Sequence, residues 1–142
     1  MITNERGYLI RDARPEDIDD IARIHQRMGL DYKMPNLESP LFLIQKVVER
    51  NGKVIAASAL RLEAETYLWL SPDLDALDKV EAMRGMQPAI VQDAWERGLD
   101  NLVCWIPEEV EKKFRRRLKT LGWQRDREGW HSWSRPTTPD GK

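Results

Sequence analysis

Cysteine and histidine are scarce in this chain, which holds one cysteine, Cys104, and two histidines, His25 and His131. A single thiol excludes an internal disulfide and any cysteine-rich zinc site. Cys104 stands in an apolar stretch, where a thiol packs as a small and inert side chain. We therefore expect neither a disulfide nor a bound metal.

Long apolar stretches are missing too. No run approaches the roughly 20 apolar residues that cross a bilayer, and the first residues lack the apolar centre of a signal peptide. We therefore expect a soluble, cytoplasmic protein that makes no contact with a membrane.

Neither sign of charge is in excess. The 23 basic and 24 acidic side chains leave a net charge of −1, so no overall field attracts nucleic acid or an anionic surface. We expect nucleic acid not to be a partner, and any such contact would have to be local. The 142 residues, of which 41% are hydrophobic, suit one globular domain. We expect that domain over residues 1–135 and a flexible tail over residues 136–142.

The first half of the chain reads as strand, helix and hairpin. A short strand at Tyr8–Arg11 precedes a helix that begins near Pro15 and ends near Gly29. Residues 30–40 read as a loop. Asn51 and Gly52 are the strongest short hairpin signal, so we expect paired strands over residues 41–50 and 53–62.

The second half alternates strands and helices. We expect a third strand of the meander over residues 65–70, and a helical pattern over residues 77–97 that Pro88 either kinks or divides. A strand buried on both faces should cover residues 102–106, and a helix should run from Glu108 to near Gly122. Two closing strands are expected over residues 123–127 and 130–134.

Three local stretches, taken with this order of elements, resemble the GNAT superfamily of N-acetyltransferases. Val48–Ala56 is similar to that family's second hairpin, Leu68–Pro72 to the end of its fourth strand, and Leu118–Trp123 to the exit from its last helix. The resemblance covers residues 8–134. It implies an α/β fold with a mixed, twisted sheet of six to seven strands flanked by about four helices.

The resemblance also implies a site for acetyl-coenzyme A or another acyl-coenzyme A. In that family the cofactor lies between two splayed parallel strands, with its pantetheine on the fourth strand and its pyrophosphate on the next helix N-terminus, where free amides bind anions. The corresponding cofactor-binding residues are Leu68, Trp69, Leu70, Ser71, Asp78 and, for the ribose phosphate, Arg115.

The chain departs from the family at the pyrophosphate loop. The expected signature, Arg or Gln followed by two residues, Gly, one residue and Gly or Ala, is matched in no register. Asp73, Asp75, Asp78 and Glu81 make this segment acidic instead, and carboxylates repel a diphosphate. Acids at a helix start also serve as caps. The alternative is a pocket for a cationic ligand, or no pocket.

Candidate catalytic residues are few. The resemblance implies that Glu65, with Glu63 as the second choice, is the general base, and a surface glutamate without a catalytic role is the alternative. Leu118 stands where the family often has a tyrosine acid. A lone histidine such as His131 is usually structural.

A basic cluster and a group of tryptophans complete the sequence features. Six basic residues occupy eight positions from Lys112 to Lys119, and Trp123, Trp130 and Trp133 gather near the end. The cluster suits a solvated helix or phosphate contacts, and the tryptophans suit packing or a ligand groove.

Two functions follow. The first is an acyl-coenzyme-A-dependent N-acyltransferase that acts on an amine of a small molecule or protein, as a monomer or homodimer. The second is a catalytically silent binding module. Fold similarity alone does not choose between them.

Overall fold

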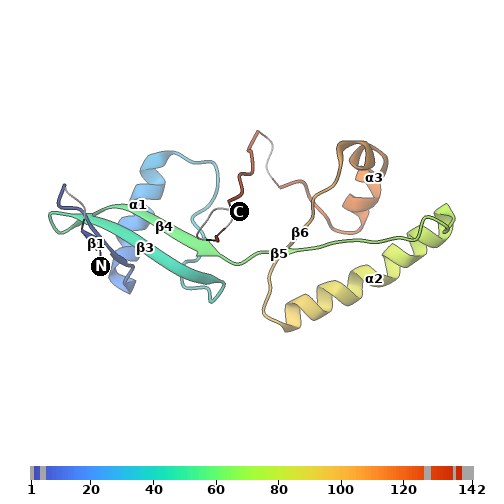
Figure 1. The fold of residues 1–142 in the computed structure, drawn as a ribbon, viewed down its shortest axis with the longest axis horizontal. Helices are drawn as coiled ribbons and strands as arrows, with labels where there is room; N and C mark the ends of the chain where they lie inside the picture. The colour runs from blue at the N-terminus through green and yellow to red at the C-terminus, as the bar shows by residue number, and fades with distance from the viewer. Residues whose placement is uncertain (1, 4–5, 127–128, 136, 139–142) are drawn as a thin grey trace. The chain divides into compact units, whose positions relative to one another are not determined.

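The computed structural model describes residues 2–3, 6–126, 129–135 and 137–138, which form two compact units (Figure 1). The first unit comprises Met1–Leu68 and Gln92–Cys104, and the second comprises Trp69–Val91 and Trp105–Lys142. Helix α2 (Ala76–Glu96) contributes to both units.

An antiparallel sheet forms the body of the first unit. Its strands are β1 (Ile2–Thr3), β2 (Leu9–Asp12), β3 (Phe42–Arg50) and β4 (Lys53–Arg61), in the order β1-β2-β3-β4. Asn51 and Gly52 both have positive φ, 53° and 75°, as a tight hairpin turn between twisted strands requires. The predicted hairpin is confirmed.

A helix packs on this sheet. The 3₁₀ turn η1 (Pro15–Asp17) leads into α1 (Ile18–Met28), which ends where Gly29 takes the left-handed conformation with φ of 65°. Helix α1 contacts β4, as Figure 1 shows. The buried apolar residues of the described chain, Leu37, Val47 and Val54, all belong to this unit.

A buried cluster of charged side chains connects the sheet to the 3₁₀ turn that precedes α1. Both Arg11 terminal nitrogens donate to the Asp17 carboxylate, at 2.7 and 2.9 Å, while its Nε donates to Glu49 at 2.8 Å. The Arg11 and Asp17 side chains are only 8% and 7% exposed. Buried charges are tolerated because they are paired and hydrogen-bonded.

A separate pair of strands replaces the expected single sheet. Strands β5 (Ala64–Glu65) and β6 (Leu102–Val103) pair in parallel, with Ala64 opposite Leu102 and Glu65 opposite Val103. The prediction of one mixed sheet of six to seven strands is therefore wrong. The strands divide into a four-stranded antiparallel sheet and a two-stranded parallel one, and the described residues form three α-helices, not about four.

Four expected strands are shorter or absent, for a common reason. Strand β5 does not extend the meander, β6 stops at Val103, and the described residues of the two closing segments form no strand. Arg127 lies outside the described residues. Strand propensity reflects burial against neighbours more than backbone preference, and Trp69, Trp105 and Trp133 are 82%, 70% and 94% exposed. Without such packing, aromatic residues do not hold a strand.

Two helices dominate the second unit. Helix α2 is one helix with Pro88 inside it, so proline removes one hydrogen bond without dividing the element. Helix α3 (Glu108–Thr120) begins after Pro107, as predicted. The Trp123 indole donates to the Gln87 amide oxygen at 2.9 Å and fastens the end of α3 to α2. No described residue of this unit is fully buried.

Candidate functional site

The pairing of β5 with β6 ends at a defined point. At this end of the ladder the Thr66 amide donates a hydrogen bond to the Val103 carbonyl, at 2.7 Å. Beyond it, residues 66–71 and 104–107 lie outside strands and helices. Two parallel strands therefore begin side by side and leave strand structure at the same level.

The direction of the backbone groups at this point follows from strand geometry. In an extended chain, alternate residues turn their amide and carbonyl groups to the same side. Thr66 turns its amide toward β6, so in an extended chain Leu68 is the next residue with that orientation. Its side chain is 51% exposed. An extended ligand that carries amides could continue the ladder here, as in strand addition to a sheet edge.

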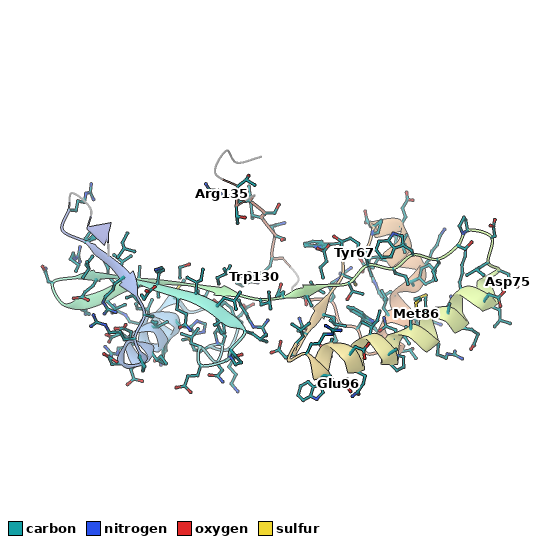
Figure 2. All side chains as sticks on the ribbon, turned by 60° about the horizontal axis from the view of Figure 1, so that its bottom comes forward. Tyr67, Asp75, Met86, Glu96, Trp130 and Arg135 are labelled. Carbon is teal, nitrogen blue, oxygen red and sulfur yellow. The ribbon has the colours of Figure 1, made fainter. Side chains whose placement is uncertain are left out.

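Glu65 and Tyr67 flank the last paired residue. The Tyr67 hydroxyl is hydrogen-bonded to the Glu65 carboxylate, and this bond together with the negative charge raises the pKa of Tyr67. Figure 2 labels Tyr67 on the segment that leaves β5. Both side chains are exposed, so the carboxylate is accessible from solvent. A carboxylate beside a phenol is a pair of groups able to handle a proton.

The sequence interpretation chose Glu65 and missed Tyr67. A usable signal was present, since the two residues are two positions apart and strand side chains repeat every two residues. Side chains at this spacing in a strand share one face, so Glu65 also pointed to Tyr67.

The expected pantetheine residues fall on both sides of the boundary between the units. Leu68 belongs to the first unit with Glu65, and Trp69, Leu70 and Ser71 belong to the second. Trp69 is 82% exposed, whereas Leu70 is half-buried. The Ser71 hydroxyl accepts from the Asp73 amide at 3.3 Å and shapes the turn before α2.

Asp75 and Asp78 lie at the start of α2. The Asp75 carboxylate accepts a hydrogen bond from the Asp78 amide at 2.8 Å, which satisfies one of the free amides of the first turn. Figure 2 labels Asp75 at this end of the helix. A carboxylate already occupies the place where a phosphate would have to bind, so these residues do not fit a pyrophosphate.

Arg115 lies on α3 and pairs with an acid of the same helix. It contacts Glu111 at 3.1 Å. Glu111 also accepts from Arg125, and this bond, followed by the contribution of Arg115, holds the pKa of Glu111 below its usual range. Arg115 is therefore engaged within its own unit, and a ribose phosphate would compete with Glu111 for it.

Two clefts open on the first unit. An open cleft of about 600 Å³ has Asp12, Arg14, Glu38 and Lys46 among its lining residues. Lys46 pairs with Asp12 at 2.5 Å, which leaves the charges in this cleft mixed and partly neutralised.

The second cleft, of about 150 Å³, lies between α1 and the sheet and is lined mostly by apolar side chains. His25 borders it and bonds the Tyr32 carbonyl through Nε2 at 2.9 Å. The two rings meet edge to face at 4.9 Å. These contacts give His25 a structural role in holding the loop against α1.

Within the described ranges, no group of three or more His, Cys, Asp and Glu side chains could hold a metal ion. Among the helices of that same part of the chain, none combines the length and the apolar character needed to cross a bilayer.

No family model matches the chain, and comparison with curated proteins and with solved structures gives no match either. The candidate site is defined by geometry alone, at the end of the β5–β6 ladder.

Proposed function

We propose that the chain binds an acyl-coenzyme A and transfers its acyl group to an amine. The observation that carries this proposal is the β5–β6 ladder. It ends at Thr66 and Val103, and the segments that follow the two strands lie outside strand structure. The pantetheine arm of coenzyme A is an extended chain with two amide groups. Backbone groups that line an interrupted ladder can pair with such a chain.

Glu65 is the residue that would accept a proton in this reaction. An amine is protonated at neutral pH and attacks a carbonyl only after it loses that proton. The Glu65 carboxylate lies at the end of the ladder, is exposed, and is bonded to Tyr67, which restrains its orientation. The acyl thioester supplies the activated carbonyl: its carbon forms a bond to the amine nitrogen, the bond to sulfur breaks, and coenzyme A leaves as a thiolate that takes up a proton. The acceptor is an amine of a small molecule or of a protein.

The nucleotide half of the ligand has weaker support. The start of α2 carries Asp75 and Asp78, with the Asp78 amide already bonded to a carboxylate. Anions are favoured at helix starts only where amides are free and acids do not repel them. We therefore expect the acyl-pantetheine arm to contribute most of the binding free energy.

Calorimetric titration tests this proposal. Acetyl-coenzyme A and acetyl-pantetheine are expected to bind with dissociation constants within about tenfold of one another, a difference of about 1.4 kcal/mol. Adenosine bisphosphate, the nucleotide half alone, is expected to release no measurable heat. Binding of the nucleotide half without the arm would contradict the assignment to β5 and β6.

The second candidate is a binding module without catalysis. Exposed tryptophans favour it, because Trp69, Trp105 and Trp133 are each at least 70% exposed and large exposed apolar side chains often mark interaction sites. The same titration separates the two functions. A module of this kind would give no heat with acetyl-coenzyme A or acetyl-pantetheine at millimolar concentration.

A further inference from the structure

The charges of this chain are unevenly distributed along it. Residues 112–142 hold 10 basic and 3 acidic side chains, a net charge of +7, whereas residues 1–111 hold 13 basic and 21 acidic ones, a net charge of −8. The overall charge of −1 hides this division. A marked asymmetry of charge between two parts of a chain is typical of contact with a polyanion.

Helix α3 concentrates the basic side chains on one face. Lys112, Arg116 and Lys119 follow one another at helical spacing, and Lys113 lies beside them. The apolar residues Phe114, Leu118 and Leu121 share the opposite face and are half-buried. A small pocket of about 130 Å³ is lined by Val80, Met83 and Arg84 of α2 and by Arg117, Thr120 and Leu121, so this side of α3 faces α2. Lys112, Lys113, Arg116 and Lys119 do not line this pocket.

Ion pairs within the helix leave part of this face uncompensated. Glu111 compensates Arg115, and Glu108 lies 3.6 Å from Lys112. No described residue forms an ion pair with the remaining three basic side chains of this face, which are Lys113, Arg116 and Lys119. All three are exposed. They span the last two turns of the helix, about 9 Å at 1.5 Å per residue.

We propose that this basic face of α3 binds the phosphate backbone of a nucleic acid without reading its sequence. Three uncompensated cations on a rigid helix match a row of phosphates, and a helix of this diameter fits the major groove of duplex DNA. A lipid surface is the other polyanion to consider. Surface binding by a helix requires an exposed apolar face beside the charges. On α3, Phe114 and Leu118 are half-buried, and the exposed apolar side chain is Val110 in the first turn, at 42%.

Fluorescence anisotropy with a labelled DNA duplex tests the proposal. Three phosphate contacts predict that the logarithm of the association constant falls with the logarithm of salt concentration at a slope of about −3. Scrambling the duplex sequence should leave the affinity unchanged. A slope near zero, or no binding at low salt, would overturn the proposal.

Matched charge reversals locate the surface. The triple variant K113E/R116E/K119E should bind at least tenfold more weakly than the unchanged chain. The control K33E/K53E/R97E alters the net charge equally at exposed positions elsewhere, and it should keep most of the affinity. Equal losses in both would assign the binding to overall charge and contradict a site on α3.

Variants that remove the charges without reversing them, and binding to lipid vesicles, test the same site. The variant K113Q/R116Q/K119Q removes the charges without placing acids at the C-terminal end of the helix, where they oppose its dipole, and it should also lose at least tenfold. Circular dichroism checks that each variant folds. Phosphatidylserine vesicles provide the other arm, and binding to vesicles without binding to the duplex would overturn the proposal.

Discussion

At the scale of single residues, the buried cluster of Arg11, Asp17 and Glu49 is the strongest constraint on the first unit. Asp17→Asn keeps the shape of the side chain and an acceptor for the Arg14 amide, but it leaves Glu49 as the one carboxylate that pairs with the buried Arg11. We expect a loss of about 3 kcal/mol in the free energy of unfolding, measured with urea. The control Asp19→Asn, at an exposed position on α1, should change it by less than about 0.5 kcal/mol. Equal effects would show that the cluster is not a stabilising element.

The same cluster sets a pH window. The hydrogen bond from Arg11 lowers the pKa of Asp17 to about 2, against about 3.9 for an unperturbed aspartate. The stabilisation is therefore complete above about pH 4 and is lost as the pH falls through about 2. The difference in stability between the unchanged chain and Asp17→Asn should shrink across that window. A constant difference down to pH 2 would contradict the assignment.

The pair of Glu65 and Tyr67 gives a second test at this scale. Glu65→Gln removes the charge that raises the pKa of Tyr67, so that pKa should fall toward its ordinary value. The measurement is an absorbance titration of the tyrosines, with Tyr67→Phe identifying the signal. Glu63→Gln removes a neighbouring carboxylate on which the pKa of Tyr67 does not depend in this structure. It should leave the titration unchanged.

At the scale of elements, substitution of a glycine inside α2 and of a glycine just after it should have opposite effects on stability. A Cβ built at Gly85 meets no atom within 4 Å, and Gly85 lies inside the helix. Gly85→Ala should therefore stabilise the protein by about 1 kcal/mol. Gly98, just after the helix, has φ of 82°, so Gly98→Ala should destabilise by about 1 kcal/mol. Urea midpoints of the two variants should move in opposite directions, and movement in the same direction would contradict the helix end assigned here.

Elements that depend on local chemistry were predictable from the sequence. Asn51 and Gly52 determine the hairpin, because few other residues adopt positive φ at both turn positions. Helix α3 follows from its apolar spacing and from Gly122, which has φ of 90° after the helix. These signals lie within a few residues of the structure that they predict.

Elements that depend on distant partners were not predictable. Strands β5 and β6 are 38 residues apart, and each contributes two residues to the ladder. The Val, Leu and aromatic content of both stretches predicted longer strands, yet the propensity of such residues depends on burial that they do not have. Glu65 and Leu68 were candidates from a resemblance. The sequence did not indicate that the β5–β6 pairing stops at Thr66 and Val103; only the structure shows it.

At the scale of the whole molecule, the two units differ in how they are stabilised. The first has buried apolar residues and a buried ion cluster. In the second, α2 and α3 are joined by partly exposed contacts such as the bond from Trp123 to Gln87. Segments with few buried contacts open with a smaller free energy than a packed core. The functional residues proposed here lie at the edge of the better-packed unit and on the exposed face of α3.

The most direct test of the central claim is calorimetric titration of acetyl-coenzyme A into Leu68→Pro and Leu68→Ala. Proline removes the amide that an extended pantetheine arm would pair with, whereas alanine keeps it and removes the same exposed side chain. We predict that Leu68→Ala binds within about twofold of the unchanged chain and that Leu68→Pro binds at least tenfold more weakly, which corresponds to about 1.4 kcal/mol. Equal affinity for the two variants would contradict the assignment of the pantetheine site to the end of the β5–β6 ladder.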